Sequence, residues 1–101
     1  INRGGEKISP LEIDAVILAH PEIEQVVCFA VPHPKLGEDI AAAVVLKEGS
    51  KLDEPAIRDF IAQQVSAFKV PRSVVILDEI PKGATGKIQR IGMAKSLGMI
   101  D

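Results

Sequence analysis

The sequence predicts a small α+β domain in which helices flank a sheet of about three main strands. Segments 10–19 and 53–68 carry closely spaced apolar residues of the kind found in helices. Three short valine-rich or alanine-rich runs, at 26–31, 40–47 and 73–77, have the length and composition of strands. The chain has 101 residues, 47% of them hydrophobic, which is enough apolar material for one core. With a short terminal helix, the expected order is helix, strand, strand, helix, strand, helix.

The first helix is predicted to begin after Ser9 and to continue to about Ala19. Ser9 is expected to be the N-cap, with Pro10 at the first helical position and Glu12 as the capping-box partner. Apolar residues occupy nearly every side of this segment, so we expect the helix to be buried on two sides. His20, which follows it, is expected to cap the helix or lie on the surface rather than to act in catalysis.

The run 26–31 is apolar almost throughout, as in central strands, and is expected to pair with the strand at 40–47. Cys28 within it is expected to be a small buried hydrophobe, because nothing nearby in the sequence would stabilise a thiolate. Residues 32–37 form a turn between the two strands. A catalytic role for His33 in this turn is not expected, because no partner for it can be identified.

Asp53 is predicted to cap the second helix, whose apolar residues recur at helical spacing. The third strand follows at 73–77. Residues 89–97 are predicted to form a terminal helix that docks through Ile91, Ala94 and Leu97, although Gly92 interrupts its pattern.

Charge is distributed unevenly along the chain. Residues 1–59 carry a net charge of −5 and residues 60–101 a net charge of +3, which together give the formal −2. A pI near 5.7 and only three aromatic residues argue against a general nucleic-acid-binding surface. No apolar run of ~18 residues and no signal-peptide pattern is present, so neither a membrane span nor a secreted protein is expected.

The single cysteine rules out an internal disulfide and a multi-cysteine metal site, and the cytoplasm is the expected compartment. No metal ligands are expected elsewhere in the chain. The chain lacks an initiator methionine and opens almost inside a motif, from which we expect a piece of a longer protein.

The segment most suggestive of chemistry is 81–90, which reads Pro-Lys-Gly-Ala-Thr-Gly-Lys-Ile-Gln-Arg. Gly83 and Gly86 make backbone conformations of positive φ accessible. Lys87 therefore lies on an exposed loop, where a flexible positive charge can meet an anionic ligand. An ordinary solvated lysine is the plain alternative.

A Walker A phosphate loop is excluded. That motif requires a glycine where this chain has Pro81, and a Ser or Thr where it has Ile88.

The loop resembles the C-terminal lysine motif of the acyl-CoA synthetase, luciferase and peptide-synthetase adenylation superfamily, Pro-Lys-x-x-x-Gly-Lys-(Ile/Val)-x-Arg. The positions that fill it are Pro81, Lys82, Gly86, Lys87, Ile88 and Arg90. A second signature, Gly-Gly-Glu-x-Ile-x-Pro-x-Glu-Ile-(Glu/Asp), is matched by Gly4, Gly5, Glu6, Ile8, Pro10, Glu12, Ile13 and Asp14. The motifs lie in the right order and span essentially the whole chain, which is similar to the small C-terminal domain of an acyl-CoA ligase.

The resemblance implies a reaction in two steps. A carboxylic acid and ATP give an acyl-adenylate and pyrophosphate, and the thiol of coenzyme A then takes the acyl group. Lys87 would be the catalytic residue of the first step, bridging carboxylate and phosphate oxygens, with Gly86 and Arg90 completing its motif. ATP, Mg²⁺ and the acid would bind mostly in a large N-terminal adenylation domain of the same chain. Residues 1–101 would be the mobile C-terminal domain, inactive alone.

The resemblance also implies a set of residues that meet coenzyme A and its pantetheine arm: Gly4, Gly5, Phe68, Lys69 and Arg72. The glycines would line the tunnel, the aromatic ring would stack on adenine, and the two cations would contact phosphates. Simple core packing is an equal alternative for Phe68. Val70 and Leu36 depart from the family pattern, because some members carry a basic residue at the first position and an aromatic residue at the second.

Two other classes of protein share this order of elements. One is a non-catalytic α+β ligand-binding or regulatory module, and the other is an interaction domain that uses the apolar first helix. A regulatory module has no reason to carry both motifs in register, which favours the ligase. The preference for coenzyme A over a carrier-protein thiol rests on residues 1–7, which are similar to the corresponding loop of many coenzyme A ligases.

Overall fold

The computed structural model describes residues 1–83 and 86–100; Ala84 and Thr85 of the predicted lysine loop, and Asp101, lie outside these ranges. It confirms the α+β class and adds a short hairpin at the start of the chain. The elements, in chain order, are β1 (Asn2–Arg3), β2 (Glu6–Lys7), α1 (Pro10–Leu18), β3 (Ile23–His33), β4 (Gly37–Leu46), α2 (Glu54–Ala62), the 3-10 helix η1 (Ala67–Lys69), β5 (Ser73–Leu77) and α3 (Met93–Ser96).

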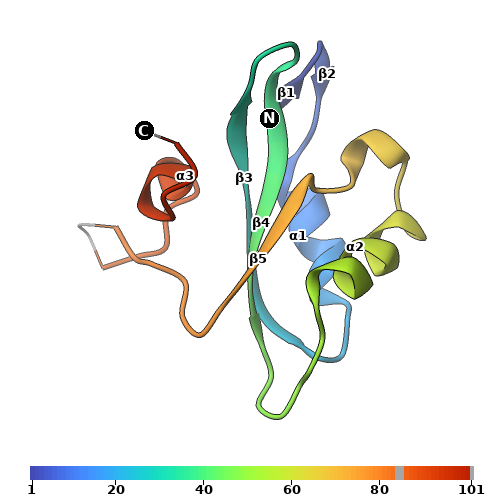
Figure 1. Cartoon of the computed structure of the whole chain (residues 1–101), viewed down its shortest axis with the longest axis vertical. Coiled ribbons are helices and arrows are strands. Elements are labelled where there is room, and N and C mark those ends of the chain that lie inside the picture. Colours follow the sequence, from blue (N-terminus) through green and yellow to red (C-terminus); the bar gives the residue numbers. More distant parts are fainter. Residues whose placement is uncertain (84–85, 101) are drawn as a thin grey trace.

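Strand β4 is the centre of the sheet (Figure 1). It pairs with β3 in antiparallel fashion, from Ile23 opposite Leu46 to His33 opposite Gly37. It pairs with β5 in parallel fashion and, at Gly37, with β1. The predicted pairing of the first two long strands is therefore confirmed. Because β4 and β5 are parallel, the chain returns between them through α2 and η1.

The sheet separates two apolar cores. Helices α1 and α2 lie on one face and α3 on the other (Figure 1). Alternate residues of β4 point to opposite faces, so Ile40, Ala42 and Val44 join the core beneath α1 and α2. Ala41, Ala43 and Val45 join the second core, which also contains Phe29 and Met93.

The sequence prediction that β3 resembles a central strand is wrong. Among the described strands β3 pairs only with β4, so it forms an edge of the sheet. It is apolar on both faces for another reason: Cys28 packs into one core while Val27 and Phe29 pack into the other. Covering by helices, rather than a second strand neighbour, explains its composition.

Helix α1 is buried on one side and not on two. Ile13 and Ile17, one turn apart, are fully buried, whereas Leu11 is 67% exposed and Leu18 is 50% exposed. The expected capping box is also absent. The Ser9 side chain makes no cap hydrogen bond. Glu12 instead pairs with Lys69, whose Nζ lies 3.1 Å from its Oε1.

Helix α2 begins as predicted, because the Asp53 side chain accepts a hydrogen bond from the backbone N–H of Ala56 at 3.0 Å. The terminal helix is shorter than predicted. Gly92 has φ +87° and precedes the first helical residue, Met93, so α3 cannot extend back to residue 89. Ile91, expected to dock on the domain, is 94% exposed.

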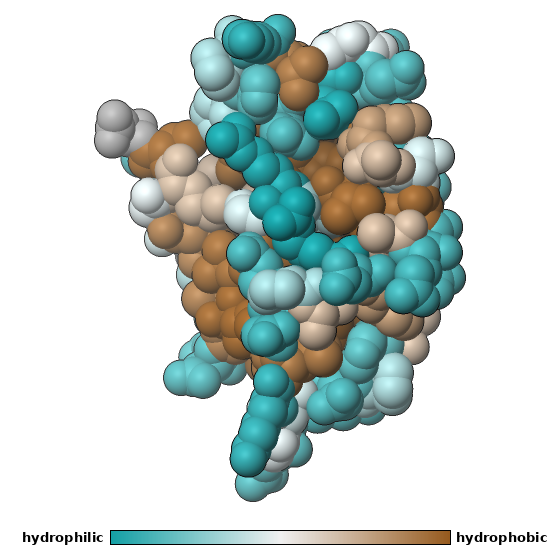
Figure 2. Space-filling view, turned by 45° about the vertical axis from the view of Figure 1, so that its right-hand side comes forward, coloured by the Kyte–Doolittle hydropathy of each residue, from teal (hydrophilic) through white to brown (hydrophobic). Residues whose placement is uncertain are grey.

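Over residues 1–83 and 86–100, none of the helices has the length and apolar character needed to cross a membrane. Apolar surface is nevertheless present on the outside, and Figure 2 shows areas of it between hydrophilic side chains on one face. Among the described residues, the large apolar side chains classed as exposed are Leu11, Leu18, Ile76, Ile88, Ile91 and Ile100.

The two helix starts yield a matched prediction. Asp53→Ala should lower the free energy of unfolding by about 1 kcal/mol, because it removes the acceptor of the Ala56 N–H. Ser9→Ala should change it by less than about 0.5 kcal/mol, because no cap bond is lost. Urea denaturation followed by far-UV circular dichroism measures both, and equal costs would contradict the assignment of caps.

Candidate functional site

The lysine loop connects β5 to α3 and carries Lys87 as an exposed side chain. The N–H of Gly86 donates to the carbonyl oxygen of Gly83 at 2.9 Å, and the N–H of Gly83 donates to that of Lys87 at 2.8 Å. These bonds hold the two flanks of the loop together. Gly86 has φ +79° and so uses the conformational freedom predicted for it.

Arg90 attaches the downstream end of this loop to the sheet. Its Nη1 donates to the carbonyl oxygen of Cys28 in β3. Its Nη2 donates to Oδ2 of Asp14 in α1 at 2.9 Å. The arginine thus joins the segment before α3 to the helix on the opposite face, around the edge formed by β3.

Asp14 completes a closed set of contacts. Its Oδ1 accepts the backbone N–H of Cys28 at 2.7 Å while its Oδ2 accepts from Arg90. Both backbone groups of Cys28 are therefore bound by side chains, which satisfies an edge of the sheet that would otherwise need water. The side chains of Asp14 and Arg90 are 18% and 29% exposed, so the ion pair is partly shielded from solvent.

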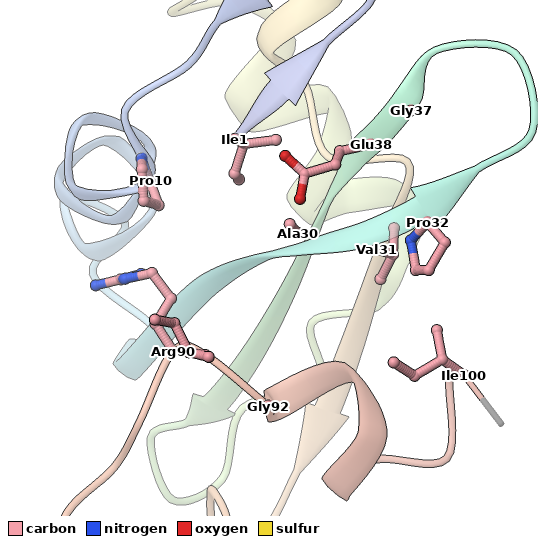
Figure 3. A pocket seen from close by; sticks show the side chains of 11 residues that line it. Ile1, Pro10, Ala30, Val31, Pro32, Gly37, Glu38, Arg90, Gly92 and Ile100 are labelled. Carbon is pink, nitrogen blue, oxygen red and sulfur yellow. The ribbon is translucent and has the colours of Figure 1, made fainter.

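A cavity of about 430 Å³ lies beside this anchor, at the end of the β3–β4 pair (Figure 3). Figure 3 shows Arg90 at one side of it, with the guanidinium turned toward α1. Its walls are mostly apolar, with Glu38 and Arg90 as the charged residues. The lining residues are Ile1, Pro10, Ala30, Val31, Pro32, Gly37, Glu38, Arg90, Ile91, Gly92 and Ile100.

Gly4 and Gly5 form the two-residue turn of the β1–β2 hairpin. Their φ values of +58° and +93° suit the mirror-image turn that joins such strands, because L-residues other than glycine rarely adopt both. The hairpin is fastened to the sheet. Arg3 Nε donates to Asp39 Oδ1 at 3.1 Å, and the N–H of Gly4 donates to the carbonyl oxygen of Leu36 at 2.8 Å.

Phe68, Lys69 and Arg72 lie around the connection from α2 to β5. Phe68 is half-buried and packs against the core beneath α1 and α2, and the Lys69 ammonium lies 5.9 Å from its ring centroid. Lys69 is also the partner of Glu12. Arg72 is exposed, and its backbone N–H is bound to the carbonyl oxygen of Ile40 at 2.8 Å.

The residues singled out in the sequence therefore occupy three places (Figure 1). The segment that carries Lys87 lies on the face of α3, the connection with Lys69 lies on the face of α1 and α2, and the glycine hairpin lies at one end of the sheet. Within the first motif, Asp14 contacts the second through Arg90.

Both histidines have local structural contacts. The Nδ1 of His20 accepts the N–H of Glu22 at 3.0 Å, and its ring packs edge-on against Phe60. The Nδ1 of His33 accepts the N–H groups of Lys35 and Leu36, which closes the β3–β4 turn. Both histidines thus have structural contacts in the turns that follow α1 and β3.

The Cys28 thiol is buried, as predicted. Burial, and secondarily the Asp14 carboxylate, raises the pKa of this thiol well above its ordinary value. The thiol is therefore neutral and unreactive in the folded protein.

The family model for the AMP-binding enzyme C-terminal domain matches residues 12–87. This chain belongs to that family. A probable CoA ligase from Humulus lupulus is 57% identical over 89% of the chain, and an oxalate–CoA ligase from Arabidopsis thaliana is 54% identical over 89%. The chain spans 17% and 18% of those two proteins.

Solved structures agree with this AMP-binding enzyme C-terminal domain. The ATP-bound crystal structure of MatB from Rhodopseudomonas palustris superimposes with a TM-score of 0.86 and 29% identity, covering 95% of this chain and 19% of that one. An acyl-CoA synthetase structure from Brucella canis gives a TM-score of 0.83 with 28% identity, covering 97% of this chain and 19% of its own.

Sequence reasoning missed the role of Asp14, the last position of the first motif, because it assigned this residue no contact. No local pattern connects it with Arg90, because the two residues are 76 positions apart. The one available signal was that each motif of this C-terminal domain ends on a charge, and that the two charges are opposite.

The raised pKa of Cys28 yields a prediction about stability. A thiol that keeps its proton when folded stabilises the domain below the unfolded pKa, and this contribution is lost as the pH rises above it. The free energy of unfolding should thus fall above about pH 9, by up to about 1.4 kcal/mol per pH unit. The chain has no tyrosine to titrate in this range. Urea denaturation near pH 8, 9 and 10 should show a clearly smaller slope in Cys28→Ala, and an unchanged slope would contradict the assignment.

Proposed function

We propose that this chain is the C-terminal domain of an ATP-dependent, AMP-forming carboxylate:CoA ligase, in which Lys87 is the adenylation lysine. The observation that carries the proposal is the family match over residues 12–87 together with an exposed Lys87 on an anchored loop. Because the chain is about a fifth of the length of its relatives, the remaining parts of the site belong to a preceding N-terminal adenylation domain.

In the first step a carboxylate oxygen attacks the α-phosphorus of ATP, and the bond to the leaving pyrophosphate breaks. Two anions must approach each other, so the transition state needs compensating positive charge. The Lys87 ammonium supplies it by contacting oxygens of both partners. A unit charge at 4 Å is worth about 1 kcal/mol in bulk water and about 4 kcal/mol at the lower dielectric near a protein surface, so the lysine acts when the domains close.

In the second step the thiol of coenzyme A gives up its proton to water, its sulfur attacks the acyl carbon, and AMP leaves with the electron pair of the broken bond. Lys69 and Arg72 contact phosphates of coenzyme A, Phe68 contacts its adenine, and Gly4 and Gly5 line the path of the pantetheine arm. Their separation from the lysine loop supports a rotation of the whole domain between the steps (Figure 1).

Mg²⁺ is proposed for the first step, where it neutralises the phosphates of ATP. Across the described ranges no group of three or more His, Cys, Asp and Glu residues is arranged to hold a metal ion. As the family resemblance implies, we assign the ion to the nucleotide and the N-terminal domain, and the charge proposed for this chain comes from lysine and arginine.

The acid substrate is chosen outside this domain, but the relatives rank the candidates. Two proteins named oxalate–CoA ligase, from Arabidopsis thaliana and Saccharomyces cerevisiae, are 54% and 46% identical to this chain. Oxalate is accordingly the first acid to test. A compartment that keeps the single thiol reduced, such as the cytoplasm, suits the protein.

A non-catalytic regulatory module remains the competing class. In such a module the exposed Lys87 would have no catalytic role, and the candidate coenzyme A residues would serve binding alone. Acid-dependent exchange of pyrophosphate into ATP by the parent protein separates the two classes, because a regulatory module has no such activity.

Lys87→Ala in the full-length protein should lower the rate of acid-dependent ATP–pyrophosphate exchange by roughly 10²- to 10³-fold, because one charged contact of the transition state is lost. Thioester formation from preformed acyl-adenylate should be nearly unchanged. Lys95→Ala, an exposed lysine of α3, is the matched control and should retain both rates. Equal losses in the two half-reactions would contradict the role given to Lys87.

Arg72→Ala should raise the KM for coenzyme A by roughly 10-fold, since a charge-assisted phosphate contact is worth about 1.5 kcal/mol. Pyrophosphate exchange, which does not involve coenzyme A, should stay unchanged. Lys51→Ala removes an exposed cation from a different loop and serves as the control. A normal KM in Arg72→Ala would remove this residue from the proposed site.

A further inference from the structure

We propose that Asp14 is a positioning residue for the lysine loop: its carboxylate holds Arg90, and Arg90 determines where Lys87 is presented. The proposal rests on the function proposed above and adds a residue of α1 to the adenylation machinery. Asp14 touches no substrate in it and acts through the arginine.

The segment that carries Lys87 is anchored on both sides. Upstream of Lys87 the chain is held by Ile80, which is buried in the core on the α3 face. Downstream, Arg90 follows Lys87 by three positions and is bonded to Cys28 in β3 and to Asp14 in α1. Ile91 and Gly92 are exposed, so the next buried residue is Met93. Loss of the Arg90 contacts would lengthen the loosely held segment at its catalytic end.

The anchor at Arg90 is held by several contacts. Arg90 makes contacts to two separate elements, the carbonyl oxygen of Cys28 in β3 and the carboxylate of Asp14 in α1. Asp14 is itself held by the N–H of Cys28 at 2.7 Å. Each side chain is thus fixed at two points, and neither can turn without breaking a bond to the edge strand. Charge-assisted, partly shielded contacts of this kind are stronger than exposed ion pairs.

The proposed role of Lys87 requires its ammonium group to be placed accurately. A lysine side chain is long and flexible, and the ammonium has to reach two developing anions at once. A misplacement of about 1 Å at a reacting centre costs up to about 10²-fold in rate. Because the backbone is fixed at Arg90, three residues away, the Lys87 ammonium can reach a smaller range of positions.

Asp14→Asn tests the arginine contact selectively. The asparagine Oδ1 can still accept the N–H of Cys28, whereas its amide N–H₂ would face Arg90 and cannot pair with it. In the full-length protein we expect the turnover of pyrophosphate exchange to fall roughly 10-fold, with little change in the KM for ATP. Thioester formation from preformed acyl-adenylate should keep its rate. Arg90→Lys, which keeps the charge but loses the fork of donors, should show the same pattern.

Glu54→Gln is the matched control. Glu54 in α2 accepts the N–H of Val74 in β5 at 2.6 Å, so it covers the opposite edge of the sheet as Asp14 covers β3. It has no part in the lysine loop. Thermal unfolding should report similar small losses for both variants, and only Asp14→Asn should lose exchange activity.

Limited trypsin digestion gives a readout independent of activity. Cleavage after Lys87 should quicken several-fold in Asp14→Asn, because the loop has lost its downstream anchor, and should be unchanged in Glu54→Gln. Equal cleavage in the two variants would show that Arg90 holds the loop without Asp14, which overturns the proposal.

The decisive comparison introduces Asp14→Asn into Lys87→Ala. If Asp14 acts through the lysine, the second substitution should lower the residual exchange by less than about 2-fold. A full 10-fold further loss, or full exchange in the single variant Asp14→Asn, would overturn the proposal while leaving the proposed function intact. Absence of exchange with every acid in the unmutated parent would refute the proposed function itself, and the inference with it.

Discussion

The burial of β4 is the constraint on which the rest of the structure depends. All residues from Ile40 to Val45 are buried, and the strand alternates between two faces, so both faces require an apolar layer. The first layer is supplied by α1 and α2, and the second by α3 with Ile80. Three consecutive alanines, residues 41–43, keep β4 thin, which lets the large side chains of both layers approach the sheet.

A sheet covered on both faces still has edges, and this domain covers them with carboxylates. Asp14 accepts the N–H of Cys28 on β3, and Glu54 accepts the N–H of Val74 on β5. Each acid belongs to a helix packed on the same face. An edge protected in this way offers fewer free backbone groups for pairing with another chain. On the β3 side the same carboxylate also binds Arg90, so fold and candidate site share one residue.

Features encoded by neighbouring residues could be predicted from the sequence. The three main strands follow from the composition of short apolar runs, whereas the turn with His33 and the cap at Asp53 depend on contacts within a few positions; each was found. The capping box at Ser9 was not found: the Ser9 side chain makes no cap bond, and the Glu12 carboxylate pairs with Lys69, 57 positions away. The edge position of β3 could not be predicted from the sequence either, because a strand covered by helices on both faces has the apolar composition of a central strand.

The candidate site shows the same division. Lys87 and its glycine could be placed on an exposed loop from the sequence, and the resemblance to the family motif implies the chemistry proposed for the lysine. The attachment of that loop could not be predicted, because it joins residues 14, 28 and 90 through side-chain and backbone groups from three elements. Sequence reasoning recorded two of these residues as motif members without connecting them.

In the proposed function, the exposure of Lys87 to water controls when the lysine can stabilise the transition state. An ammonium surrounded by water stabilises a nearby anion by about 1 kcal/mol, against about 4 kcal/mol once the surroundings have a lower dielectric. The difference corresponds to roughly a 100-fold change in rate, and it arises only when a second surface excludes water from the lysine. A rigid anchor at Cys28 and an unshielded charge at Lys87 are therefore complementary: the anchor limits where the charge arrives, and closure determines when it becomes effective.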